Sequence, residues 1–283
     1  MSQAAVRGPL GDPIIVSPSL DELAVAIEAN EHDHLSRGFG SLPGAEYGDE
    51  GDLVWFVTGR PQHWLNGVAK VRLRPRQADR RIDETLERCR SRALPQSWAV
   101  LPTTAPADLP QRLLDHGISH DGDMPLMAGD LDRIPAPVAA PPGLRIDRVT
   151  DDASRERFLA AFVSGFDMGP DLADVFRYLV TNAGPEWRRF VATLDGRPVG
   201  TAGVHLAGGV AGLYNVETLA EFRRRGIGAA VSAAALRDAR AQGYRVGILG
   251  STDLGRNVYR RLGFEDVCAM RVFVWRPPGA PIS

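Results

Sequence analysis

The sequence predicts an α/β fold made of two similar modules, on three observations. Stretches with strand-like alternation and stretches with helical spacing succeed one another along the whole chain. Residues 134–143 contain four prolines in ten residues, which can neither continue a helix nor form a central strand. The two halves repeat one order of elements, ending in strand, turn, long helix, strand, short helix and strand. We therefore expect domains at 1–133 and 144–283, joined by a linker at 134–143.

The elements of the first half follow from the spacing of apolar residues and from turn residues. A polar loop is expected at 38–52, and the helix at 109–116 should end at Gly117. The expected strands are 14–17, 53–58, 68–73, 98–101 and 126–131, and the expected helices are 19–35, 77–93 and 109–116.

The second half is predicted in the same way. Pro170 stands in the favoured first position of a helix, Gly243 ends one, and Asp253 is expected to cap one. The turn at 195–198 separates two antiparallel strands. The expected strands are 144–149, 190–194, 199–205, 212–218, 245–249 and 268–275, and the expected helices are 152–166, 170–182, 227–242 and 253–262.

Composition is that of a soluble globular protein, with 44% hydrophobic and 24% charged residues among 283. A net charge of −2 gives no reason to expect a nucleic-acid or membrane surface. Two cysteines are too few for a disulfide framework or a four-cysteine zinc site. No signal peptide and no membrane-length apolar run is visible, so we expect a cytoplasmic protein.

The most informative stretch is the turn at 223–229, between the strand at 212–218 and the helix at 227–242. It holds three arginines and two glycines, and the first turn of the helix has no carboxylate. Acidic residues usually stand there, because the N-terminus of a helix carries a partial positive charge. A bare, glycine-containing helix start with added cations favours an anion-binding site. The plainer interpretation is a solvated basic turn.

A second motif makes the first specific. Arg223-Arg-Arg-Gly226-Ile-Gly228 is followed, about thirty residues later, by Val258-Tyr259-Arg-Arg-Leu-Gly263-Phe264, with a helix, a strand and a helix between them. This pair resembles the acyl-CoA motif and the Tyr-x-x-x-Gly-Phe signature of the GCN5-related N-acetyltransferases (GNAT). The resemblance covers roughly 144–275. It implies the GNAT fold, a mixed, mostly antiparallel sheet flanked by helices.

The first half shares only the order of elements with this family. Its corresponding turn, 74–79, has no glycine and places Asp79 where an anion would sit. We expect the first half to be a degenerate GNAT-like module without a cofactor motif, so that the chain has one acyl-CoA site.

The resemblance implies acetyl transfer from acetyl-CoA to a primary amine of a small molecule or peptide. The amides of the arginine turn would bind the pyrophosphate, and the fourth strand of the family's sheet would pair with the pantetheine arm. Tyr259 would protonate the leaving thiolate, and Glu217 is the candidate general base. The implied cofactor-binding residues are Val216, Glu217, Thr218, Arg223, Arg224, Arg225, Gly226, Ile227, Gly228 and Ala229.

Several alternatives stay open from sequence. A water relay could replace Glu217 as the base, and acyl chains longer than acetyl are compatible with the motifs. Direct transfer in a ternary complex is favoured over an acyl intermediate on Cys268, because no activating base is recognisable beside that cysteine. Neither a metal site nor a nucleic-acid partner is expected, and the chain could be a monomer or a homodimer. The alternative function is a non-catalytic acyl-CoA sensor.

Overall fold

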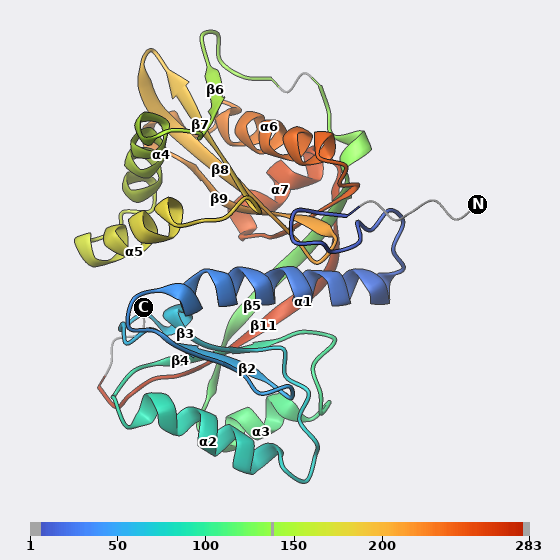
Figure 1. Ribbon diagram of the computed structural model, residues 1–283, viewed down its shortest axis with the longest axis vertical. Coiled ribbons are helices and arrows are strands. Elements are labelled where there is room, and N and C mark those ends of the chain that lie inside the picture. Colours follow the sequence, from blue (N-terminus) through green and yellow to red (C-terminus); the bar gives the residue numbers. More distant parts are fainter. Residues whose placement is uncertain (1–6, 137–138, 280–283) are drawn as a thin grey trace. The chain divides into compact units, whose positions relative to one another are not determined.

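The chain divides into two compact units, each built from two separate segments. Unit 1 contains Met1–Asn30 and Leu126–Val267, and unit 2 contains Glu31–Pro125 and Cys268–Ser283. The computed structural model describes residues 7–136 and 139–279. Figure 1 shows the helices and strands of both units.

Unit 2 is a sheet whose strands pair antiparallel except at one step. β1, β2 and β3 form an antiparallel meander, β3 pairs parallel with β4, and β4 pairs antiparallel with β11. A buried core that includes Trp98, Ile82 and Phe273 holds this sheet to its helices. Its elements are the end of α1 (Leu20–Arg37), β1 (Glu46–Asp49), β2 (Val54–Val57), β3 (Asn66–Ala69), α2 (Ala78–Arg90), β4 (Gln96–Val100), α3 (Leu109–Asp115), the start of β5 (Ser119–Asp130) and the larger part of β11 (Phe264–Trp275).

Unit 1 repeats this pairing pattern. β6 to β9 are antiparallel neighbours, β9 pairs parallel with β10, and β10 pairs antiparallel with β5. Its elements are the start of α1 (Leu20–Arg37), the end of β5 (Ser119–Asp130), β6 (Arg145–Arg148), α4 (Asp152–Gly165), α5 (Pro170–Thr181), β7 (Trp187–Leu194), β8 (Arg197–Ala207), β9 (Val210–Thr218), α6 (Ile227–Ala241), β10 (Val246–Gly250) and α7 (Asp253–Arg261).

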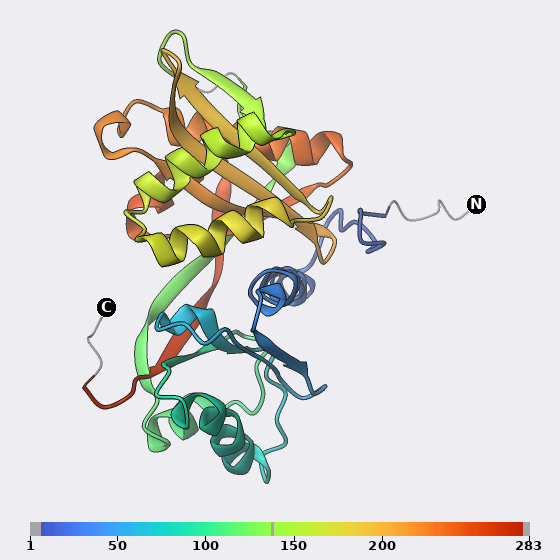
Figure 2. The same cartoon turned by 60° about the vertical axis from the view of Figure 1, so that its left-hand side comes forward.

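Helices cover both faces of the unit 1 sheet. Arg188 on β7 donates to the carboxylate of Asp238 on α6 with Nη2 at 2.7 Å, so α6 lies on the face that Arg188 reaches. Because successive side chains of a strand point to opposite faces, Arg189 faces the other helices. Figure 2 shows α4 and α5 running across that second face.

The last strand of each half of the sequence pairs within the unit of the other half. β5 follows β4 and α3 along the chain, yet its residues Leu126–Asp130 pair with β10. β11 follows β10 and α7, and its residues Arg271–Trp275 pair with β4. The compact units are therefore cut differently from the expected division at 134–143, because strand pairing, not position along the chain, decides membership. That division remains a proposal about sequence modules.

Most expected elements are present, with four corrections. The strand expected at 68–73 lies at Asn66–Ala69. The expected strand at 14–17 is absent: Ile15 N–H donates to the Gly209 carbonyl at 3.0 Å without forming a ladder, and residues 16 and 17 form a bend. The expected loop at 38–52 contains β1. The cap of α7 is Thr252, whose side chain accepts from Gly255 N–H, and Asp253 is the first helical residue. Within the described residues, no helix is both long and apolar enough to cross a bilayer.

Candidate active site

The arginine turn presents backbone N–H groups at the start of α6. Gly226 caps the helix with φ +83°, and Arg224 also has a positive φ of +63°. Such angles favour glycine, and an added Cβ at Gly226 would stand 2.3 Å from the Ala139 carbonyl oxygen. Across the described part of the chain, the N–H groups of 224–229 donate no hydrogen bond to protein. This array of amides at a helix N-terminus suits an anion.

The three arginines of this turn have different surroundings. Arg223 donates through Nε to the Thr218 carbonyl at 3.0 Å and through Nη2 to the Glu217 carboxylate at 2.9 Å. The guanidinium carbon of Arg225 lies 5.5 Å from the centroid of the Phe222 ring. Arg224 is exposed. Arg223 therefore already binds the end of β9, while Arg224 extends into solvent beside the unbonded amides.

A bulge in β9 shapes the strand before it reaches the turn. The pairing of β8 with β9 shifts between Thr201 and Gly203, and Asn215 has a φ of +55°. The buried Thr201 hydroxyl donates to the Asn215 carbonyl at 2.8 Å, which holds the bulge in place. Bulges of this kind bend a strand and interrupt its ladder.

β9 and β10 separate beyond a short paired region. Their parallel pairing consists of Gly247 with Ala211 and Ile248 with Gly212. Among the described residues, no ladder joins Val216–Thr218 to β10, and Glu217 and Thr218 pair with Thr201 and Gly200 of β8 on the other side. A strand edge without a ladder accepts an extended chain by strand addition. Val216, Glu217 and Thr218 are half-buried along it.

Glu217 extends toward α4. An added Cβ at Gly165, the last residue of that helix, would stand 2.1 Å from Glu217 Cγ. The carboxylate accepts from Arg223, and the Glu217 side chain is 12% exposed. Only a residue without a side chain at position 165 leaves room for this placement. Glu217 is thus positioned by α4 on one side and by the arginine turn on the other.

Tyr259 lies on α7, half-buried against the unit 1 core. Its ring contacts Phe264 edge-on, with centroids 6.3 Å apart, and its Cε2 atom lies near Gly255. Burial, reinforced by the negative charge of Glu217, raises the pKa of Tyr259 to about 12. Tyr259 and Glu217 therefore lie close enough to interact electrostatically, and the phenol is protonated at neutral pH.

The corresponding turn of unit 2 is built differently. α2 begins after Gln77, which has right-handed helical angles, and Asp79 stands in its first turn. Arg112 donates to the Asp79 carboxylate at 2.7 Å and lowers the pKa of that carboxyl. A fixed carboxylate thus takes the position at this helix start that an anion would need.

Sequence reasoning missed the residues that support the site. Thr201 holds the bulge, and Gly165 makes room for Glu217. Neither carries a local signal, because each acts through a partner distant in sequence. Burial raises the pKa of the Cys268 thiol, which opposes thiolate formation.

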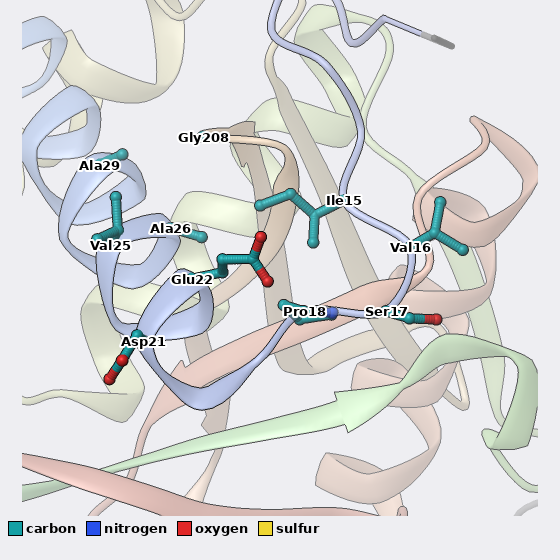
Figure 3. A pocket seen from close by; sticks show the side chains of 10 residues that line it. All are labelled: Ile15, Val16, Ser17, Pro18, Asp21, Glu22, Val25, Ala26, Ala29 and Gly208. Carbon is teal, nitrogen blue, oxygen red and sulfur yellow. The ribbon is translucent and has the colours of Figure 1, made fainter. Parts of the chain in front are cut away.

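A cavity of about 600 Å³ lies elsewhere on unit 1. Figure 3 shows it between the segment at 15–18, the first turns of α1 and Gly208. Gly208 belongs to the hairpin at the start of β9, whereas the arginine turn follows the end of that strand. The cavity therefore lies at the opposite end of β9 from Glu217 and Tyr259.

A scan against protein families matches residues 152–264 to the acetyltransferase (GNAT) family. These residues resemble a GNAT domain. The match extends from α4 to the start of β11 and includes the arginine turn, Glu217 and Tyr259. GNAT enzymes are acyltransferases that act on amine acceptors. A comparison with curated proteins gave no match.

Solved structures share the fold over nearly the whole chain. A GCN5-related N-acetyltransferase from Kribbella flavida is 23% identical with a TM-score of 0.69, covering 92% of this chain and 97% of its own. One from Sphaerobacter thermophilus is 18% identical with a TM-score of 0.63, covering 94% and 96%. A tandem GNAT protein from the clavulanic acid biosynthesis pathway is 17% identical with a TM-score of 0.60, covering 93% and 94%. At these identities the likeness concerns the fold.

Proposed function

We propose that this protein transfers the acetyl group of acetyl-CoA to a primary amine of a small molecule or peptide, by direct attack in a ternary complex. The observation that carries the proposal is the convergence of three features in unit 1. These are the unbonded amides of 224–229, the open edge of β9, and Tyr259 beside Glu217.

Each feature suits one part of the cosubstrate. The pyrophosphate of CoA binds the amides at the start of α6, with Arg224 as the nearby exposed cation. The pantetheine arm pairs with β9 along Val216–Thr218 and displaces Arg223 from the Thr218 carbonyl, which it now occupies at 3.0 Å. The remaining proposed contacts are Glu217, Arg225, Gly226, Ile227, Gly228 and Ala229. The thioester then lies between the separating ends of β9 and β10.

Acetyl transfer requires a neutral amine and a protonated leaving thiol. Tyr259 donates a proton to the thiolate as the tetrahedral intermediate collapses. A pKa of about 12 makes this phenol a weak acid. However, the thiolate of CoA would form beside Tyr259, and burial there raises the pKa of the thiol as it raises that of the phenol. Glu217 accepts the proton of the attacking amine, directly or through a water molecule, once Arg223 has released it.

Measuring thiol release from acetyl-CoA in the presence of a panel of primary amines tests this function. Amine-dependent release supports an acetyltransferase. Saturable binding of acetyl-CoA without release for any amine would favour the alternative, an acyl-CoA sensor. The half-buried, protonated Tyr259 favours the enzyme, because a sensor needs no proton donor. We further propose that unit 2 binds no cofactor, as its corresponding turn carries Asp79.

A further inference from the structure

Arg189 is a buried cation with no hydrogen-bonded partner among the described residues. The residue is 7% exposed, and its Nε atom is buried without a hydrogen bond. None of the described residues accepts a hydrogen bond from its terminal nitrogens. Its neighbour Arg188, by contrast, is paired with Asp238 on the opposite face of the sheet. Buried charges in proteins are normally paired, because desolvation of an unpaired charge is costly.

The surroundings of Arg189 supply no hydrogen-bonded counter-charge. The guanidinium lies 4.7 Å from the Trp187 ring centroid, a contact that supplies no counter-charge. Burial lowers the pKa of Arg189 to about 10, the charge of Glu186 opposes this, and that of Arg155 adds to it. Glu186 is itself bound to the Gly184 N–H at 3.2 Å, and Arg155 donates to Asp152. Among the described residues, therefore, no carboxylate is hydrogen-bonded to Arg189, although Glu186 lies close enough to act on its charge.

Arg189 occupies the same sheet face as the proposed reaction centre. Arg189 is on β7 and pairs with Gly203 on β8, which in turn pairs with Tyr214 on β9. Thr201 lies two residues before Gly203 on β8 and pairs with Glu217 on β9. The Glu217 side chain reaches α4, which covers the same face of the sheet as Arg189. Two strand spacings and two residue steps place the Cα atoms of Arg189 and Glu217 roughly 12 Å apart.

We propose that Arg189 binds an anionic group of the acceptor, so that the acceptor is a primary amine that also carries a carboxylate or a phosphate. Arginine suits this role because its planar guanidinium binds either group through two parallel hydrogen bonds. The anion sits at Arg189 while the amine reaches the thioester beside Glu217 and Tyr259. This inference rests on the proposed function and names its substrate class.

The test compares matched acceptors that differ only in charge. The probes are the straight-chain amino acids from glycine to aminooctanoic acid, their carboxamides, and aminoalkyl phosphates of similar length. Wild-type protein should acetylate the best anionic probe at least tenfold more efficiently, in kcat/KM, than its uncharged counterpart. Arg189→Met should lose this preference, because kcat/KM should fall at least tenfold more for the anionic probe than for its carboxamide. Carboxylates and phosphates are compared directly, which identifies the anion.

Arg188→Met is the matched control. It removes the same charge one residue away, but from the face that contacts α6, so it should keep the preference for anionic acceptors. It should also lower the midpoint of thermal unfolding, because it breaks a bonded ion pair with Asp238. Arg189→Met should leave that midpoint unchanged or higher. A structural role for Arg189 would give the reverse, a less stable variant with unchanged preference, and would overturn the inference. Arg189→Gln provides a second variant if Arg189→Met does not fold.

Calorimetric binding of the same probes to the CoA-saturated protein separates this inference from the proposed function. Selective binding of anionic probes that Arg189→Met and Arg189→Gln lose would support the anion site even if no probe is acetylated. Equal binding of charged and uncharged probes, or an unchanged preference in both variants, would overturn it.

Discussion

At the scale of single residues, Tyr259 is the proton donor of the proposed reaction. Burial and the charge of Glu217 raise its pKa to about 12, against 10.0 for an unperturbed tyrosine. A spectrophotometric titration of the wild type minus Tyr259→Phe should therefore show one phenol ionising near pH 12. Because the pKa is raised by folding, this group's contribution to stability should be intact below pH 10 and lost as the pH rises toward 12. Ionisation near pH 10 would contradict the placement of Tyr259.

Gly165 offers a steric test of Glu217. An added Cβ at this position would stand 2.1 Å from Glu217 Cγ, so Gly165→Ala must move the carboxylate. We expect turnover of the amine to fall about tenfold, as for other displaced general bases, with little change in acetyl-CoA affinity. Gly169→Ala is the control, because no atom lies within 4 Å of its added Cβ. Equal turnover in both variants would remove Glu217 from the proposed mechanism.

At the scale of elements, the arginine turn and the helix start form one anion site. Arg224→Glu combined with Gly226→Asp places two carboxylates at the proposed pyrophosphate position and should abolish calorimetric binding of acetyl-CoA. Gly226→Asp also forces a side chain into a position with φ +83° against the Ala139 carbonyl. Circular dichroism should show that the double variant is folded.

Arg76→Glu is the control for the double variant Arg224→Glu, Gly226→Asp. It makes a similar charge change in the corresponding turn of unit 2, at an exposed residue. Binding should remain, with one acetyl-CoA per chain. If Arg76→Glu reduces the stoichiometry, the chain has a second site and the proposal for unit 2 fails.

Local signals predicted most elements. Pro170 begins α5 as expected, and Gly243 follows α6 with a φ of +102°. The strand expected at 68–73 lies instead at Asn66–Ala69. Asn66 is polar but buried there, because its side chain bonds the Thr58 N–H and the Arg60 carbonyl. Sequence spacing cannot reveal such a bond, since the partner lies on another segment.

The candidate site shows the same limit. The motif residues around Gly226 and Tyr259 were recognisable because they are close together in sequence. The direction of the Glu217 side chain could not be predicted, because the bulge at Asn215 and the close approach of Gly165 decide it. Arg189 gave no signal either: an arginine beside Arg188 in a strand reads as exposed until the opposite face is seen to be buried.

At the scale of the whole molecule, the exchange of last strands ties the two halves together. A fragment of residues 144–283 follows the expected module boundary but lacks Leu126–Asp130, the partner of β10. It also lacks Met127, Leu131 and Ile134 of the unit 1 core. We expect it to aggregate, because β10 would present an unpaired apolar edge.

Co-expression with residues 1–143 should restore a soluble protein by supplying that strand. Size-exclusion chromatography of the fragment alone and of the co-expressed pair measures both outcomes. A monomeric 144–283 fragment with a cooperative unfolding transition would show that the exchanged strand is dispensable.

The most direct test of acetyl transfer with Tyr259 as the proton donor is a comparison of wild type and Tyr259→Phe, with free thiol and N-acetylated amine quantified in the same reaction. We predict one acetylated amine for each thiol released by the wild type. In Tyr259→Phe, turnover should be at least tenfold lower while acetyl-CoA affinity is nearly unchanged. Wild-type protein that binds acetyl-CoA but forms no acetylated amine, or equal turnover in the two proteins, would contradict these predictions.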